Sequence, residues 1–356
     1  MSIFFETDTD KHNEEIRNCS MRFWKTHQEE CANLPSITDS PTEIIIKPEA
    51  LDVSQLDADD SLALWRPLEW NEYIGQENLK NILQGYIRGC KERERNFPHI
   101  LIDGHAGTGK TTIINLIAHQ LQIPFVECIT NTIQSPQQFV DKLADCQGGI
   151  LFLDELQEIN RKVANFILPL LEDFKVNGKR IKPFTLAGAT TEKGILIKKY
   201  KPLVDRMKIQ KTLEPYTLKE LQILTKQYKQ KMFSKQNIEE QIYEQISENC
   251  RGTPRIAIRY LESYIFMSCS IEKVFCSYGI IKNGFTKDDI KILQLLSEKE
   301  KGVGLKSLSA YLGTSEENYL YQIEQYLLEQ GLITIANRRV ITEKGKQFLK
   351  EISCLG

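Results

Sequence analysis

A glycine-rich segment in the first half of the chain has the residue types and the spacing that bind phosphate. It reads Gly104-His-Ala-Gly-Thr-Gly109-Lys110-Thr111, follows an apolar stretch and opens a helical pattern. Glycines such as Gly107 and Gly109 let backbone N–H groups curve around phosphate oxygens, and the helix that follows adds the positive end of its dipole. In this P-loop pattern we expect Lys110 to reach the β- and γ-phosphates of a nucleotide and the Thr111 hydroxyl to bind Mg2+.

A pair of carboxylates ends the next apolar stretch, Gly149-Ile-Leu-Phe-Leu153-Asp154-Glu155. Ligands of an open α/β sheet gather at the carboxyl ends of its strands. We therefore expect Asp154 to hold Mg2+ and Glu155 to polarise the water that attacks the γ-phosphate. An apolar run that ends in Asp-Glu is weak evidence by itself, because it often marks only a strand and a turn. Downstream of a P-loop it becomes stronger, and the two patterns together predict hydrolysis of ATP with Mg2+.

Three further polar residues could complete such a site. Thr190 follows an apolar stretch that ends at Ala187, where a hydroxyl could orient water against the γ-phosphate. A threonine after a strand more often caps a helix, however. Arg206 and Arg255 carry planar guanidinium groups, which neutralise charge spread over phosphoryl oxygens. A single arginine is more often part of a surface salt bridge, so the interpretation of both depends on the surrounding pattern.

The pattern of apolar residues predicts which elements position these groups. Short apolar runs at 99–103, 150–153 and 184–187 alternate with segments long enough to form helices. Such runs indicate buried parallel strands in a sheet that helices cover on both faces. Residues 65–213 are therefore expected to form a large α/β domain.

Two smaller parts are expected after this domain. The pattern is helical throughout between Thr217 and Phe275, and residues 214–284 are expected to form a small all-α lid. Residues 285–356 predict three short helices, one of which begins near Ser315, and then a β-hairpin with its tip at 337–339. Helices followed by such a hairpin suggest a winged helix.

Composition narrows the class of protein. Of the 356 residues, 46 are Lys or Arg and 48 are Asp or Glu, which gives a net charge of −2 and excludes a uniformly basic nucleic-acid coat. No apolar run is long enough for a membrane span, and the N-terminus does not read as a signal peptide, so we expect a cytoplasmic protein. The nine cysteines include no C-x-x-C pair, which argues against a disulfide framework and a zinc site.

Residues 1–64 differ from the rest of the chain. They carry an excess of acidic side chains, whereas the remainder has a modest basic excess that permits a phosphate-binding face. Their periodicity is weak, apart from a short helical pattern over 17–26 that includes Phe23 and Trp24. We expect a largely flexible extension, either a solvated tail or a peptide that docks on a partner.

The ordered set of motifs resembles the RuvB family of AAA+ motors over about residues 65–350. The matching segments are 66–67, 72–76, 169–174, 184–191, 213–216, 251–259, 302–305 and 326–332. The resemblance implies an AAA+ core, and it implies that Arg206 reaches into the site of a neighbouring subunit while Arg255 senses the nucleotide. By the same resemblance, the residues expected to contact the nucleotide are Trp65, Arg66, Gly107, Gly109, Lys110, Thr111, Thr112, Glu172, Asp173, Phe174, Arg206, Tyr216 and Arg255. The wing residues Arg338 and Arg339 are expected to contact DNA.

The family implies a hexameric ring that encircles duplex DNA and drives four-way (Holliday) junctions with ATP, beside a RuvA-type partner that binds the junction. The sequence departs from the family in several places, among them Trp65, Val204 and Met207. Only residues 175–182 separate Phe174 from Pro183, which shortens the hairpin that docks on RuvA, and Ile335 stands near the place of a second wing arginine. One alternative is a clamp-loader-like AAA+ ATPase that loads proteins onto DNA, although the Ser-Arg-Cys finger motif of clamp loaders is missing. Another is a non-motor scaffold, which the full set of catalytic residues disfavours.

Overall fold

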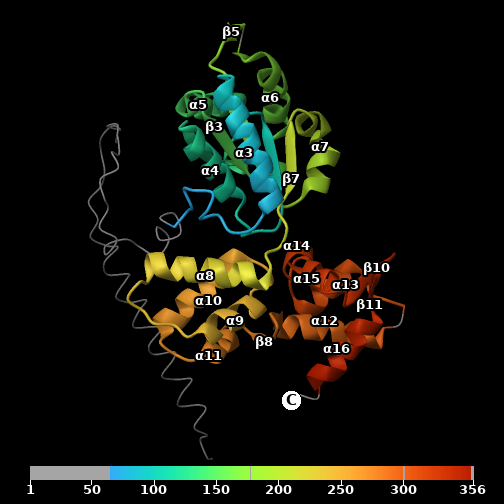
Figure 1. Ribbon diagram of the computed structural model, residues 1–356. Coiled ribbons are helices and arrows are strands. Elements are labelled where there is room, and N and C mark those ends of the chain that lie inside the picture. Colours follow the sequence, from blue (N-terminus) through green and yellow to red (C-terminus); the bar gives the residue numbers. More distant parts are fainter. Residues whose placement is uncertain (1–64, 177, 300, 354–356) are drawn as a thin grey trace, which may run out of the picture. The chain divides into compact units, whose positions relative to one another are not determined.

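The computed structural model describes residues 65–176, 178–299 and 301–353 (Figure 1). The acidic extension 1–64, with the helix expected over 17–26, lies outside the described residues. Within the described ranges, no helix has both the length and the apolar character that a membrane crossing requires.

A sheet of five parallel strands organises the described residues up to 213. Its order is β2-β3-β6-β1-β7, and every neighbouring pair is parallel. The strands are β1 (Ile100–Asp103), β2 (Phe125–Ile129), β3 (Ile150–Asp154), β6 (Thr185–Thr190) and β7 (Ile209–Thr212). Because all five run in the same direction, their carboxyl ends share one edge, where Asp103, Asp154 and Thr190 end three of them. The predicted parallel sheet is confirmed, and β2 and β7 are additional strands that the sequence analysis did not single out.

Helices cover both faces of this sheet (Figure 1). The helices of this domain are α3 (Glu77–Glu92), α4 (Lys110–Leu121), α5 (Pro136–Cys146), α6 (Arg161–Asp173) and α7 (Lys193–Asp205). Alternate side chains of a strand point to opposite faces, so Ile150 and Phe152 of β3 pack with α3 and α4. Leu151 and Leu153 pack with α5, α6 and α7 on the other face. The predicted sandwich of helices and parallel sheet is confirmed.

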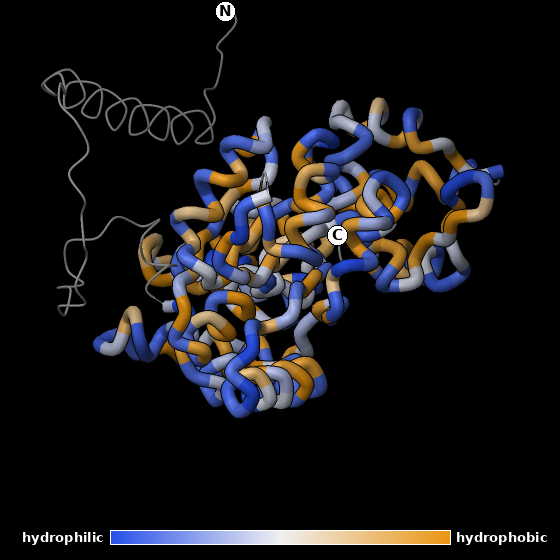
Figure 2. Tube along the Cα trace, turned by 90° about the horizontal axis from the view of Figure 1, so that it is seen from above, coloured by the Kyte–Doolittle hydropathy of each residue, from blue (hydrophilic) through white to orange (hydrophobic). Residues whose placement is uncertain are grey.

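The lid that follows is a helical cluster with its own apolar core. Its helices are α8 (Leu218–Met232), α9 (Glu240–Asn249), α10 (Pro254–Met267) and α11 (Ile271–Ser277). A capping box begins α8, since Thr217 accepts from the Glu220 N–H and the Glu220 carboxylate accepts from the Thr217 N–H at 2.8 Å. Figure 2 shows hydrophobic and hydrophilic residues alternating along the helices, as expected of elements that bury one face. A short hairpin of β8 (Ile280–Lys282) and β9 (Phe285–Thr286) ends this part. The lid is therefore not purely α-helical, because β8 follows the segment up to Phe275 for which a helical pattern was predicted.

The last part forms the predicted winged helix around a separate apolar cluster. Its elements are α12 (Lys287–Glu298), α13 (Leu305–Leu312), α14 (Glu316–Tyr319), the π-helical turn η4 (Leu320–Glu324), α15 (Gln325–Glu329), β10 (Ile333–Ile335), β11 (Arg339–Ile341) and α16 (Glu343–Ser353). Ser315 caps α14 as expected, because its hydroxyl accepts from the Asn318 N–H. The hairpin tip was predicted at 337–339, and this was wrong for Arg339. Arg339 belongs to strand β11, where it pairs with Ile335 and also forms a bridge with Val303. Helix α16 has no counterpart among the elements predicted from the sequence.

The shortened hairpin after α6 is present as β4 (Lys175–Val176) and β5 (Lys179–Arg180). Its apolar residues Val176 and Ile181 pack against the domain core. Lys175, Lys179 and Arg180 are exposed. The exposed surface of this hairpin is therefore basic.

Candidate functional site

The glycine-rich loop joins β1 to α4 at the carboxyl edge of the sheet. Gly107 and Gly109 adopt the left-handed φ values of 80° and 97° that favour glycine. A Cβ on Gly107 would lie 2.7 Å from the Arg255 Cβ, so this position also requires glycine for space. Gly109 is the N-cap of α4 and offers no side chain to the first helical N–H groups. The loop thus presents a helix N-terminus whose N–H groups can bind an anion.

Lys110 is held inside this loop. Its side chain is 7% exposed, and Nζ donates to the carbonyl oxygens of Gly104 at 2.9 Å and His105 at 3.1 Å. Burial lowers the pKa of Lys110, while the nearby carboxylates of Glu155 and Asp154 oppose that shift. The loop therefore keeps a cation next to the helix N-terminus, where a phosphate group would find both.

The two carboxylates at the end of β3 are fixed in different ways. Asp154 Oδ1 accepts from the Glu155 N–H at 3.0 Å, Thr130 at the end of β2 donates to the Asp154 carbonyl at 2.5 Å, and burial raises the pKa of Asp154. Glu155 has a left-handed φ of 52°. Its Oε2 accepts from Gln157 Nε2 at 2.6 Å and from the Thr191 hydroxyl at 3.0 Å. Both side chains line the same cavity as the glycine-rich loop.

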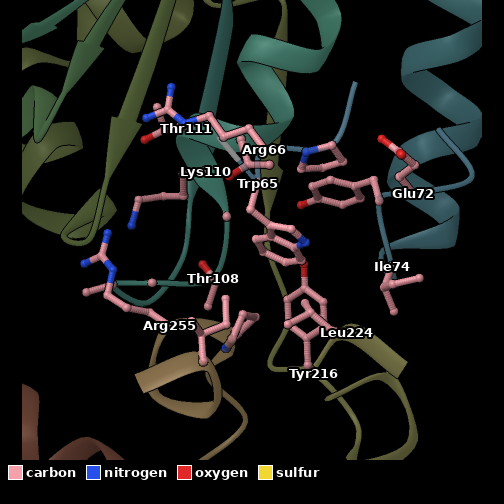
Figure 3. Close-up of a pocket in the computed structure, with 18 of the residues that line it drawn as sticks. Trp65, Arg66, Glu72, Ile74, Thr108, Lys110, Thr111, Tyr216, Leu224 and Arg255 are labelled. Atoms are coloured by element: carbon pink, nitrogen blue, oxygen red, sulfur yellow. The ribbon is translucent and has the colours of Figure 1, made fainter. Parts of the chain in front are cut away.

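That cavity has a volume of about 380 Å³, with a polar end and an apolar end. The polar end is formed by Gly107, Thr108, Gly109, Lys110, Thr111, Asp154, Glu155 and Arg255. The apolar end includes Trp65, Ile74, Tyr216 and Leu224, and Pro67 and Ile258 also line the cavity. Figure 3 shows Lys110 and Arg255 on one side of the cavity and Trp65, Ile74 and Tyr216 on the other. The shape fits a ligand with phosphates at one end and a flat apolar group at the other.

Aromatic residues give the apolar end its form. The indole of Trp65 packs edge-on against Tyr228 of α8, with ring centroids 5.1 Å apart. Burial raises the pKa of Tyr216 to about 12, so its hydroxyl stays neutral at ordinary pH. Arg66 Nη1 pairs with Glu127 Oε2 in the middle of β2, at 3.2 Å. The first described residues are thereby attached both to the lid and to the sheet.

Comparison with known proteins decides the family. The family model described as the Holliday junction DNA helicase RuvB P-loop domain matches residues 65–213. The model described as the RuvB C-terminal winged helix domain matches residues 282–350. The chain belongs to the RuvB family.

Individual RuvB proteins match along most of their length. The Holliday junction branch migration complex subunit RuvB of Fervidobacterium nodosum is 32% identical over 342 residues, which cover 89% of this chain and 95% of that protein. The subunit of the same name from Leuconostoc mesenteroides is 34% identical over 310 residues, covering 80% and 87%. The solved structure of the Thermotoga maritima RuvB Holliday junction branch migration motor matches with a TM-score of 0.71 and 32% identity, covering 80% of this chain and 98% of that one.

Most of the residues that the RuvB resemblance selected come together in the cavity. Those that line it are Trp65, Arg66, Gly107, Gly109, Lys110, Thr111, Thr112, Asp154, Glu155, Tyr216 and Arg255. Four others do not line the cavity of their own chain: Glu172, Asp173, Phe174 and Arg206. Arg206 pairs instead with Glu172 at 2.9 Å, while Phe174 packs near His99 and Phe184. A role of these four in nucleotide binding remains a prediction.

The predicted sensor Thr190 also lies behind the cavity wall. Its side chain is fully buried, and its hydroxyl donates to Gln157 Oε1 at 2.5 Å. It accepts from the N–H of Glu192 at 3.0 Å. The Thr190 hydroxyl therefore meets another side chain rather than the lining of the cavity.

The two wing arginines differ from each other. Arg338 is exposed in the loop between β10 and β11. Arg339 makes a forked contact with Glu324, with Nε to Oε2 at 2.6 Å and a second bond at 3.1 Å. Its side chain is only 16% exposed. The predicted DNA contact is available to Arg338, whereas the guanidinium of Arg339 already has a partner.

Several residues that shape the site were not anticipated. Ile258 lies one turn after Arg255 on α10, a helical spacing that could have indicated it. Glu127 and Leu224 reach the cavity from separate segments, with no local signal in the sequence, whereas Tyr73 lies in a segment that the RuvB resemblance included. Gln157 also lacked a signal, because its importance depends on the closeness of β3 and β6.

The side chains at this site suit a metal ion that is coordinated partly by phosphate and water oxygens. Among the described residues, no group of three His, Cys, Asp or Glu side chains could hold a metal ion. Thr111 and Asp154 both line the polar end of the cavity. A metal bound there would need phosphate and water oxygens as well, which is the habit of Mg2+.

Proposed function

We propose that this chain is an ATP-driven motor that moves duplex DNA and drives the branch migration of four-way junctions in recombination and repair. The observation that carries the proposal is the cavity in which the P-loop, the β3 carboxylates and the lid residue Arg255 meet. The family membership supplies the junction DNA as the expected substrate, since the matching proteins are named for it. A DNA substrate also agrees with the cytoplasmic location expected from the sequence.

The polar end of the cavity suits ATP hydrolysis. Lys110 and the N-terminus of α4 would hold the β- and γ-phosphates, and Glu155 would polarise the attacking water. Arg255 lies at the same end and would contact the phosphates from the lid, so that lid position and phosphate occupancy become linked. Trp65, Ile74 and Tyr216 would enclose the base. When bound, Mg2+ would be held by Thr111 and Asp154 and would neutralise charge on the phosphates.

A ring of identical subunits would complete this site. Arg206 and Glu172 lie outside the cavity of their own chain, which supports a position at the site of the next subunit. A guanidinium supplied in this way stabilises the charge that develops during phosphoryl transfer. The hexamer is the ring size expected from the family.

The winged helix would contact the duplex through Arg338, which is exposed and has only a 3.5 Å hydrogen bond to the Gly302 carbonyl. A RuvA-type partner would meet a basic hairpin at β4–β5, where Lys175, Lys179 and Arg180 are exposed. Any protein that docks on this hairpin would therefore need acidic groups at its surface. The clamp-loader alternative gains no support, because both family models that match are those of RuvB.

The test combines ATP turnover with junction movement. Purified protein should hydrolyse ATP faster when duplex or junction DNA is added, and should convert a synthetic four-way junction into two duplexes when ATP is present. The Lys110→Ala variant controls for contaminating ATPases. Hydrolysis without any movement of junctions, with or without a junction-binding partner, would contradict the motor.

A further inference from the structure

Gln157 joins the predicted sensor Thr190 to the predicted catalytic Glu155. It lies in η3 (Leu156–Glu158), the short 3-10 turn that follows β3, and is 5% exposed. Its Nε2 donates to Glu155 Oε2 at 2.6 Å, while its Oε1 accepts from the Thr190 hydroxyl at 2.5 Å. Gln157 does not line the cavity, whereas Glu155 does.

The chemistry of the partners fixes the direction of this chain of hydrogen bonds. A carboxylate can only accept, so the amide nitrogen of Gln157 must face Glu155 and the amide oxygen must face Thr190. The amide oxygen of Gln157 can only accept, so the Thr190 hydroxyl must donate its single hydrogen to that oxygen. The Glu192 N–H occupies a lone pair of the same Thr190 oxygen at 3.0 Å. The Thr190 hydroxyl is thereby committed on both sides, and its only donated bond goes to Gln157.

The same contacts fix one oxygen of Glu155 and leave the other available. Oε2 receives both Gln157 Nε2 and the Thr191 hydroxyl. No described residue donates a hydrogen bond to Oε1. A carboxylate held by one oxygen keeps a single rotamer while the second oxygen can bind a water. Such fixation of a reacting group by its neighbours is a general requirement for efficient catalysis.

The backbone keeps η3 close enough to β6 for Gln157 to contact both Glu155 and Thr190. A Cβ on Gly188 would lie 2.5 Å from Leu156 Cδ2, the residue that precedes Gln157 and is fully buried. Glycine at this strand position lets the turn lie directly on β6. Gln157 then reaches the end of the strand, where Thr190 and Thr191 stand.

We propose that Gln157 is a positioning residue for ATP hydrolysis, which orients Glu155 and through which Thr190 acts. The proposal rests on the ATPase function proposed above. It makes Thr190 a support of Glu155 rather than a direct contact of the γ-phosphate. Gln157 itself touches neither nucleotide nor water in this arrangement.

The experiment compares five variants with the wild-type protein in the presence of DNA. Gln157→Leu keeps the size of the side chain but removes its hydrogen bonds to Glu155, Thr190 and Thr191. Its kcat for ATP should fall about 10- to 100-fold, as is typical when a supporting hydrogen-bond partner is removed. KM and the affinity for a non-hydrolysable ATP analogue should stay unchanged. Thr190→Val should have the same effect, and the double variant should be no worse than either single one, because both act through one chain of contacts. Losses that multiply in the double variant would show that Thr190 acts separately.

The fourth variant is a matched structural control from the same strand. Thr185 is 1% exposed at the other end of β6, and its hydroxyl makes a buried bond to the Phe97 carbonyl at 2.5 Å. Thr185→Val loses a comparable hydrogen bond far from Glu155, so its kcat should stay near that of the wild type. An equal loss in Thr185→Val and Thr190→Val would mean that both act only through stability.

A rescue and a structural readout complete the test. Gln157→His should recover much of the turnover, because an imidazole can donate from one ring nitrogen and accept at the other. A crystal structure of Gln157→Leu should show Glu155 in a different rotamer. Failure of the wild type to hydrolyse ATP would refute the proposed function, whereas an active wild type with an equally active Gln157→Leu would refute this inference alone.

Discussion

Arg206 Nη2 lies 2.9 Å from Glu172 Oε1, which joins the end of α7 to the last turn of α6. Arg206 also donates to the Pro202 carbonyl at 2.8 Å, and its buried Nε has no partner among the described residues. Glu172 is exposed. The guanidinium is thus held by its own domain and does not line the cavity of its own chain.

We expect Arg206→Ala to lower ATP turnover about 1000-fold, the usual effect of removing an arginine that stabilises phosphoryl transfer. Mixing this variant with Lys110→Ala should restore activity, because an intact P-loop of one subunit then meets an intact Arg206 of the other. Turnover is measured across a series of mixing ratios. A mixture that never exceeds its two components would place Arg206 in its own subunit's site.

Glu155→Gln should retain the binding of ATP and lose turnover by about 100- to 10,000-fold, the range for removal of a general base. The amide keeps the size of the side chain but cannot take a proton from water. Nucleotide affinity from calorimetry and the rate of phosphate release separate the two effects. Turnover close to the wild-type value would mean that another group activates the water.

The two wing arginines should respond differently to replacement. Arg338→Ala should weaken DNA binding and reduce the slope of log affinity against log salt by about one, because one phosphate contact is lost. Binding measured at several salt concentrations gives this slope. An unchanged slope would move the DNA contact away from the wing.

Arg339→Ala should mainly reduce stability, since it leaves the buried Glu324 without its partner. A loss of about 3 kcal/mol is typical for such a broken pair. Replacing both Arg339 and Glu324 by methionine should recover most of that loss, because no buried charge is left alone. Denaturant unfolding of the single and double variants provides the measurement.

A pH dependence should arise from His105, which lies 3.0 Å from Glu329 of the winged helix. The hydrogen bond to Glu329 raises the pKa of His105, with Gln325 adding to the shift and burial and Lys110 opposing it. The stabilisation from this pair is therefore complete below the unfolded-state pKa of about 6.5 and is lost as the pH rises through the higher folded-state pKa.

The difference in melting temperature between wild type and His105→Gln should shrink as the pH is raised across that window. Glu329→Gln is the control, since it removes the same ion pair from the other side. A difference that does not change with pH would show that the histidine stays neutral in the folded protein.

Local patterns predicted the parts of the site that lie next to each other along the chain. The P-loop, Asp154 and Glu155 each follow a buried strand, and a parallel sheet brings such positions to one edge. The role of Gln157 could not be predicted in this way, because it depends on η3 lying against β6. The short strands β8 and β9 were missed for a similar reason, since two or three residues hold too little periodicity. The pairing of Arg339 with Glu324 depends on the fold of the wing and has no signal in the spacing of the two residues.

The two hydrogen bonds from Lys110 to backbone carbonyl groups affect how easily the protein releases the products of ATP hydrolysis. A buried ammonium stripped of partners would be strongly unfavourable, and it would hold on to any anion that came near. Here Gly104 and His105 offer their oxygens within hydrogen-bonding distance of Nζ, so a departing phosphate exposes no bare cation. An ATPase that releases phosphate in every cycle benefits from a P-loop whose own carbonyl groups stabilise the charge of Lys110.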